Sequence, residues 1–192
     1  MYIAALNSSY KNDGETAFLL NSILDICKEN GADTEIFNIY EIMRDVKNPF
    51  CICCQTPCQG ACYKNTKLDE TFKKLSEADA IIIGSPVYFR GVTAQLKAFF
   101  DKTRAIRASK AWVGKIGAAV SVGGSKYGGQ EVVIHQIHDM MLVHGMTIVG
   151  DGSDEYGAGH SGICAHNPAR NDEYAMSRIN ALAYRILEEI KK

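Results

Sequence analysis

Short apolar runs alternate with amphipathic stretches along the whole chain, and this alternation restricts the fold more than any other feature. Residues 78–84 (ADAIIIG) form the most continuous apolar run, which is typical of a strand covered on both faces. Shorter runs predict further strands at residues 2–6, 34–40, 116–122 and 146–149. Apolar side chains at helical spacing predict helices over residues 15–30, around 68–75, 92–100 and 133–141, and over 171–190. This order of β–α units predicts an α/β fold, a doubly wound five-stranded parallel sheet with helices on both faces.

Length and composition narrow the class of protein. The 192 residues suffice for a single domain spanning residues 1–192, and are too few for two ordinary ones. The net charge of −1 and the absence of a Lys/Arg stripe argue against nucleic-acid binding. No run is long enough to span a bilayer, and the first residues do not look like a secretory signal. We therefore expect a cytoplasmic protein that does not bind membranes, with residues 150–170 as a long loop before the last helix.

Ligands of doubly wound sheets bind at the carboxyl ends of the strands, near the point where the strand order reverses. The first such loop, residues 7–16, leads into a helix and carries Ser8, Lys11, Gly14 and Thr16. Backbone amides at a helix start favour a phosphate, and the hydroxyls and Lys11 suit the same ligand. Neither a Walker A nor a GxGxxG pattern is present. An ordinary capped turn would have the same composition.

Two further loops follow predicted strands. The third-strand loop, residues 84–91 (GSPVYFRG), holds an aromatic pair between Pro86 and Gly91, which suits the edge of a planar heteroaromatic ligand. The glycine loop, residues 121–130 (SVGGSKYGGQ), has four glycines within seven positions, as expected where a flat ligand approaches the backbone. A sealed sheet end and a merely flexible loop are the plain alternatives.

Together these loops carry a resemblance to a known family. The stretch 84–101 (GSPVYFRGVTAQLKAFFD) and the GG…GGQE pattern ending at Glu131 resemble the NADPH-dependent FMN reductase and multimeric flavodoxin family, close to its iron–sulfur flavoprotein branch. The resemblance implies a flavodoxin-like fold and an FMN cofactor. Its phosphate would be held by Ser8, Lys11, Gly14 and Thr16, and its isoalloxazine ring by Pro86, Val87, Tyr88, Phe89, Gly123, Gly124 and Gly128. Asp13 and Glu15 depart from the family pattern, since carboxylates repel a phosphate and must point away from it.

Five of the seven cysteines lie within twelve residues, in the cysteine loop (residues 51–62, CICCQTPCQGAC). Clustered cysteines in a cytosolic chain indicate metal binding or redox chemistry. The loop resembles the cluster-binding motif of iron–sulfur flavoproteins, with Cys51, Cys54, Cys58 and Cys62 as ligands of a 4Fe-4S cluster and Cys53 spare. Its spacing departs from the usual motif. Zinc, a redox-active dithiol, and empty or oxidised cysteines are the alternatives.

The expected function is an FMN-dependent oxidoreductase or electron-transfer flavoprotein. Because the flavin itself carries the redox chemistry, we nominate no catalytic acid or base among the side chains. NAD(P)H, a ferredoxin or the cluster itself are candidate donors, and flavins, quinones and small or protein electron carriers are candidate acceptors. The alternative is a non-enzymatic redox carrier or sensor module. A homodimer or homotetramer is expected, because Trp112 and the Tyr88-Phe89 pair would be partly exposed in a monomer.

Overall fold

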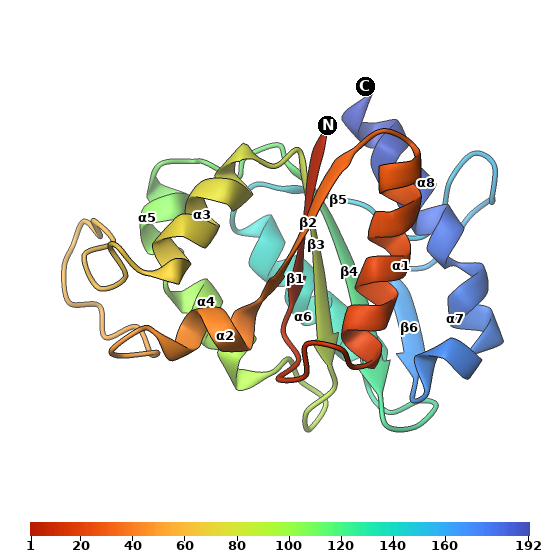
Figure 1. Ribbon diagram of the computed structural model, residues 1–192, viewed down its shortest axis with the longest axis horizontal. Helices are drawn as coiled ribbons and strands as arrows, with labels where there is room; N and C mark the ends of the chain where they lie inside the picture. The colour runs from red at the N-terminus through yellow and green to blue at the C-terminus, as the bar shows by residue number, and fades with distance from the viewer.

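A parallel sheet forms the centre of the molecule in the computed structural model, which describes residues 1–192 (Figure 1). Its strands are β1 (Tyr2–Asn7), β2 (Asp33–Asn38), β3 (Ala80–Pro86), β4 (Ile116–Gly123), β5 (Thr147–Ile148) and β6 (Ile163–His166). The order is β2-β1-β3-β4-β5, with β6 also paired to β4, and every pair is parallel. The predicted doubly wound flavodoxin-like sheet is confirmed.

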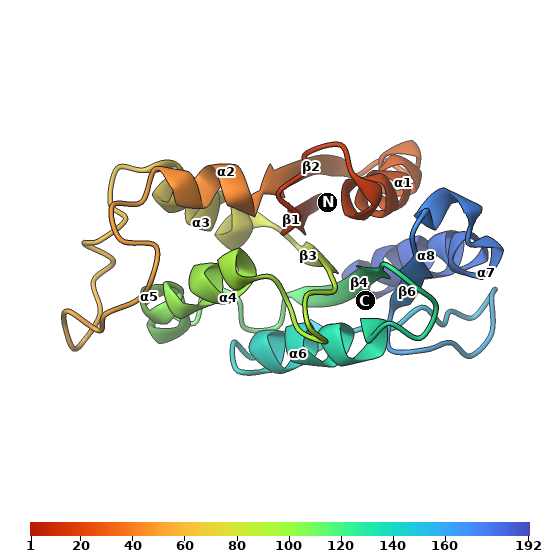
Figure 2. The same ribbon diagram turned by 90° about the horizontal axis from the view of Figure 1, so that it is seen from below.

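Helices cover both faces of this sheet. They are α1 (Glu15–Glu29), α2 (Ile39–Arg44), α3 (Lys67–Glu77), α4 (Ala94–Asp101), α5 (Arg104–Ala108), α6 (Gln130–Leu142), α7 (Glu173–Ser177) and α8 (Ile179–Ile190), with a short 3-10 turn, η1 (Ala169–Asn171). Figure 2 shows α1, α7 and α8 on one side of the sheet and α2 to α6 on the other. No helix combines the length and the apolar character needed to cross a membrane.

The alternation of side chains along the strands builds two cores. In β1, Ile3 and Ala5 belong to the core under α1 and α8, whereas Ala4 and Leu6 belong to the core under α3, α4 and α6. Each core contains 24 buried residues, so neither face of the central strands is left for solvent. This two-sided burial explains why the central strands read as continuous apolar runs in the sequence.

The fifth strand differs from the prediction at residues 146–149. Only Thr147 and Ile148 pair with the start of β4. β6 takes the same side of β4 further along and pairs with its end, from Val120 to Gly123. β6 lies inside the stretch 150–170 that we expected to be a loop. Its four residues alternate buried and half-buried positions, which is too short a pattern to separate from an irregular segment.

Two other expectations differ from the structure. The predicted strand 34–40 ends at Asn38, and α2 begins at once with Ile39, which is buried under the sheet. The predicted helix 171–190 is divided into α7 and α8 at Arg178, whose Nε donates to Oδ2 of the buried Asp151 at 2.9 Å. Both changes follow from contacts between residues distant in the sequence.

Trp112 is buried, with 1 % of its surface exposed, which contradicts the expected exposure. Its ring packs edge-on against Phe100, and the His144 ring lies 4.7 Å from it, centroid to centroid. Nε2 of His144 lies 2.8 Å from Oγ1 of Thr103. Burial, followed by the charge of Arg107, lowers the pKa of His144 to about 4. Trp112 therefore stabilises the core and gives no support for oligomerisation.

Candidate functional site

Three loops leave the sheet at the carboxyl ends of its strands, which point downward in Figure 1. The register places Asn7 beside Gly84 and Pro86 beside Val122, so β1, β3 and β4 end together. The first loop and the third-strand loop are joined directly, because the Ser8 amide donates to the Gly84 carbonyl at 2.9 Å. The predicted convergence of the three loops is thus present in the fold.

Asn7 sets the shape of the first loop. Its Nδ2 donates to the Lys11 carbonyl at 3.0 Å and to Oδ1 of Asn38 at 2.9 Å, and its Oδ1 accepts from the Ser9 amide at 3.0 Å. The Ser9 hydroxyl in turn accepts from the Lys11 amide at 3.1 Å. Asn7 is not among the predicted site residues, because its partner on β2 lies 31 residues away.

Ser8 is fully buried, and its backbone is held on three sides. Besides the bond to Gly84, its carbonyl accepts from Oγ1 of Thr93 at 3.1 Å and from Nε2 of Gln95 at 2.8 Å. Its own hydroxyl has no hydrogen-bond partner in the chain. Buried hydroxyls are nearly always paired, because an unpaired one costs free energy. A rigidly held, unpaired hydroxyl in this loop fits the prediction that Ser8 binds a ligand oxygen.

The other residues predicted to bind phosphate surround the start of α1. Gly14 is the N-cap residue in an extended conformation, Thr16 is buried in the first turn, and Lys11 is exposed with its side chain against Gly14. Glu15 is turned away, since its Oε2 accepts from the Ala169 amide at 2.6 Å. The first turn therefore presents its free amides without competition from the Glu15 carboxylate.

Gly84 brings α1 and β3 into close contact. A Cβ at this position would lie 2.8 Å from Cγ2 of Thr16 and 2.9 Å from Cδ1 of Leu20. Only glycine allows this approach, which places Thr16 over the end of β3. Gly84 was noted in the family signature, but its structural role is visible only in the packing.

The third-strand loop has a fixed base and a projecting tip. The Val87 amide donates to the Val122 carbonyl at 2.9 Å, which holds Pro86 and Val87 at the sheet edge. Tyr88 and Gly91 exchange two backbone hydrogen bonds of 2.9 Å, and Phe89 between them has a φ of 50°. Tyr88 is partly exposed and Phe89 is completely exposed. The predicted aromatic pair thus lies on the tip and does not seal the sheet.

The three glycines predicted in the glycine loop have different surroundings. A Cβ on Gly123 would collide with the side-chain amide of Gln130, and one on Gly128 would lie 2.8 Å from the Ser125 carbonyl. Only Gly124 faces open space. Gln130, which is not among the predicted site residues, fixes the loop by donating to the Ser125 carbonyl at 2.8 Å. A side chain on Gly128 would therefore meet the backbone, one on Gly123 would displace the Gln130 amide from its bond, and Gly124 is the position open to a ligand.

The cysteine loop projects from the far end of the molecule, between α2 and α3 (Figure 1). All seven cysteines of the chain are free. Residues 51–59 make no backbone–backbone hydrogen bond, so regular structure does not hold this loop. Its support is a contact between Gly60, with a φ of 71°, and the buried ring of Tyr63, which packs on Phe72 at 5.0 Å. Burial, followed by the charges of nearby cysteines, raises the pKa of Tyr63 to about 12.

The four predicted ligands share one cavity of about 60 Å³, which we call the cysteine cavity. Its lining includes Cys51, Cys54, Cys58 and Cys62 but not Cys53, together with the cations Lys102 and Arg104. The charge of Cys53, and then a hydrogen bond with Cys51, raise the pKa of Arg104. No three Cys, His, Asp or Glu side chains are close enough to hold a single metal ion. The cavity therefore brings the four predicted ligand residues together beside two cations, and such a set of soft thiols with nearby positive charge suits an anionic, thiolate-bound group.

Comparison with known proteins agrees with this architecture. Residues 1–157 match the family described as NADPH-dependent FMN reductase. An iron–sulfur flavoprotein of Methanocaldococcus jannaschii is 35 % identical over 192 residues, covering 100 % of this chain and 98 % of the relative. An iron–sulfur flavoprotein of Methanosarcina thermophila is 36 % identical over 197 residues, with the same coverage. The structure of a flavodoxin, WrbA-like protein from Agrobacterium tumefaciens superposes with a TM-score of 0.68 at 17 % identity, covering 99 % of this chain and 96 % of the other.

Proposed function

The chain belongs to the NADPH-dependent FMN reductase family and is an FMN-dependent oxidoreductase, and we propose that it takes electrons from NAD(P)H and passes them to small acceptors such as flavins or quinones. One observation carries the assignment of the site. The unpaired hydroxyl of the buried Ser8 lies in the first loop, at the carboxyl ends of the strands, where the third-strand and glycine loops also begin.

Each loop has its own part in holding FMN. Ser8, Thr16 and the amides that follow Gly14 bind the phosphate, and Lys11 adds a positive charge from the surface. Pro86 and Val87 form a rigid wall for the isoalloxazine ring.

The remaining predicted residues define the rim of the site. Gly124 leaves room for the ring edge, while Gly123 and Gly128 keep the glycine loop in shape. Tyr88 and Phe89 stand at the mouth and shield the ring from water. When bound, FMN supplies the hydride and single-electron chemistry, so no side chain is assigned a proton transfer.

Two measurements test this proposal. FMN titrated into flavin-free protein should lose fluorescence and saturate at one FMN per chain. The loaded protein should then bleach under anaerobic NADPH or NADH, and recover its yellow colour when a quinone is added. Absence of FMN binding would overturn the site, whereas a yellow protein inert to both nucleotides would favour the carrier or sensor alternative.

We further propose that the cysteine loop holds a 4Fe-4S cluster through Cys51, Cys54, Cys58 and Cys62. The shared cavity supports this ligand set, as do the two full-length relatives named iron–sulfur flavoproteins. A cluster supplies single-electron transfer, which would let the protein exchange electrons with one-electron carriers such as a ferredoxin. Anaerobic reconstitution should yield about four iron and four sulfide per chain. An iron-free product would refute it.

The exposed aromatic tips support self-association. Phe89 and Tyr127 are almost entirely exposed at the mouth of the site, and apolar surface of this kind is commonly covered by a second subunit. We therefore propose a homodimer or homotetramer in the cytoplasm, where the free cysteines would stay reduced. Light scattering that gives a monomer mass at micromolar concentration would contradict the assembly.

A further inference from the structure

Lys102, at the end of α4, is a buried lysine that no carboxylate neutralises. Only 2 % of its surface is exposed. Its sequence neighbour Asp101 pairs instead with Lys97, Nζ to Oδ1 at 2.7 Å. The only hydrogen bond of the Lys102 ammonium is to Sγ of Cys62, at 3.7 Å. Because an ammonium that loses its water without gaining a partner is strongly disfavoured, a lysine in this position indicates a negative partner.

The surroundings show where that partner lies. Lys102 lines the cysteine cavity together with Arg104 and the four predicted ligand cysteines. Asp101 also lines it, but its carboxylate is already paired with Lys97. The cavity therefore combines four soft sulfur ligands with two cations free of carboxylate partners, one buried and one at the surface.

We propose that Lys102 is the built-in counter-charge of the group bound by the cysteine loop and that it raises the reduction potential of that group. The inference rests on the proposed cluster. Four thiolates outweigh the positive charge of an iron–sulfur core, so the bound group is negative overall. Reduction adds an electron and makes it more negative still. A fixed cation and a hydrogen bond to one ligand sulfur both stabilise the reduced state.

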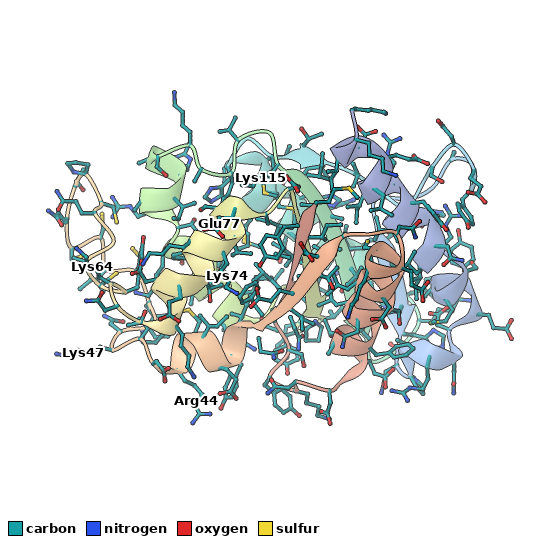
Figure 3. The ribbon with its side chains drawn as sticks, turned by 45° about the horizontal axis from the view of Figure 1, so that its top comes forward. Arg44, Lys47, Lys64, Lys74, Glu77 and Lys115 are labelled. Carbon is teal, nitrogen blue, oxygen red and sulfur yellow. The ribbon has the colours of Figure 1, made fainter.

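The test compares reconstituted full-length protein with three variants, using an anaerobic redox titration followed by electron paramagnetic resonance. Lys102→Met should lower the equilibrium constant for cluster reduction at least tenfold, which is about 59 mV for a one-electron couple. Lys102→Arg keeps the charge and should recover most of this loss. Lys64→Met is the matched control, because Lys64 lies near Cys62 in the sequence but on the open surface beside the loop, where solvent screens it (Figure 3).

Each result decides the matter. An unchanged potential in a Lys102→Met protein with four irons would overturn the role of Lys102 and leave the cluster intact. Wild-type protein that takes up no iron would overturn the cluster, and this inference with it. If Lys102→Met fails to hold iron while Lys102→Arg holds it, the requirement for charge is supported. Loss of iron in both variants would show that the shape of lysine matters and not its charge.

Discussion

Replacement of Ser8 by alanine should change stability and FMN affinity in opposite directions. The Ser8 hydroxyl is buried and has no partner in the flavin-free chain. An unsatisfied buried polar group costs about 1–3 kcal/mol, and its removal leaves only a small void. We therefore expect Ser8→Ala to raise the free energy of unfolding of the flavin-free protein by about 1 kcal/mol. For a chain of this length that corresponds to a rise in Tm of about 2–4 °C.

The same substitution removes a hydrogen bond to the FMN phosphate. Bonds to a charged group contribute about 1.5–3 kcal/mol, so the Kd for FMN should rise about 10- to 150-fold. Urea unfolding of flavin-free protein measures the first quantity, and quenching of FMN fluorescence measures the second.

Ser121 provides a matched control. Residue 121 opens the stretch defined as the glycine loop, but its buried, unpaired hydroxyl lies within β4, between Ser85 of β3 and Cys164 of β6. Ser121→Ala should give the gain in stability with a much smaller change in FMN affinity. If Ser8→Ala instead destabilises the flavin-free protein and leaves the Kd unchanged, the hydroxyl has a structural role and the phosphate site lies elsewhere.

Three further results are expected. Gly124→Val should fold with a free energy of unfolding within about 0.5 kcal/mol of wild type, yet bind FMN at least tenfold more weakly. Gly123→Val should lose about 1–3 kcal/mol of stability in urea unfolding, because its side chain displaces the buried amide of Gln130. Iron counts after reconstitution should fall in Cys58→Ser and stay near four in Cys53→Ser, and equal counts would refute the ligand set. The pKa of His144 falls to about 4 in the fold, from about 6.5 in the unfolded chain. Between those pH values only the unfolded state takes up this proton, so the free energy of unfolding should drop by at most about 3 kcal/mol from pH 7 to pH 4. His144→Gln should make this dependence of stability on pH less steep.

The parts of the fold that were predictable are those in which burial leaves a regular pattern. β3 is covered on both faces, so its sequence is continuously apolar, and α3 and α6 keep their apolar side chains at helical spacing. β6 was not predictable, because four residues carry too little pattern. Trp112 was misplaced because the aromatic cluster around it is assembled from α3, α4 and the segment after α6.

The candidate site was predictable where chemistry is local. The hydroxyls and glycines of the first loop and glycine loop, and the spacing of the four cysteines, follow from residues near each other in the chain. Asn7 and Lys102 were missed, because each acts on a partner 31 or 40 residues away. Gln130 was missed although one of its partners, the Ser125 carbonyl, is near in the chain, and its second bond, to the Ala165 carbonyl, joins residues 35 apart. Amides and lysines are common on protein surfaces, so only the folded contacts distinguish these three.

β5 and β6 share one side of β4, and this division has a consequence for the evolution of the fold. Val149 still bonds to Gly117, and β6 resumes pairing at Val120, so residues 150–161 form an excursion that begins and ends beside the same strand. Lengthening such an excursion costs only the slowly growing entropy of loop closure. The three loops that surround the proposed flavin site would not move. We therefore expect that an insertion in this excursion would add new surface without displacing the proposed flavin site.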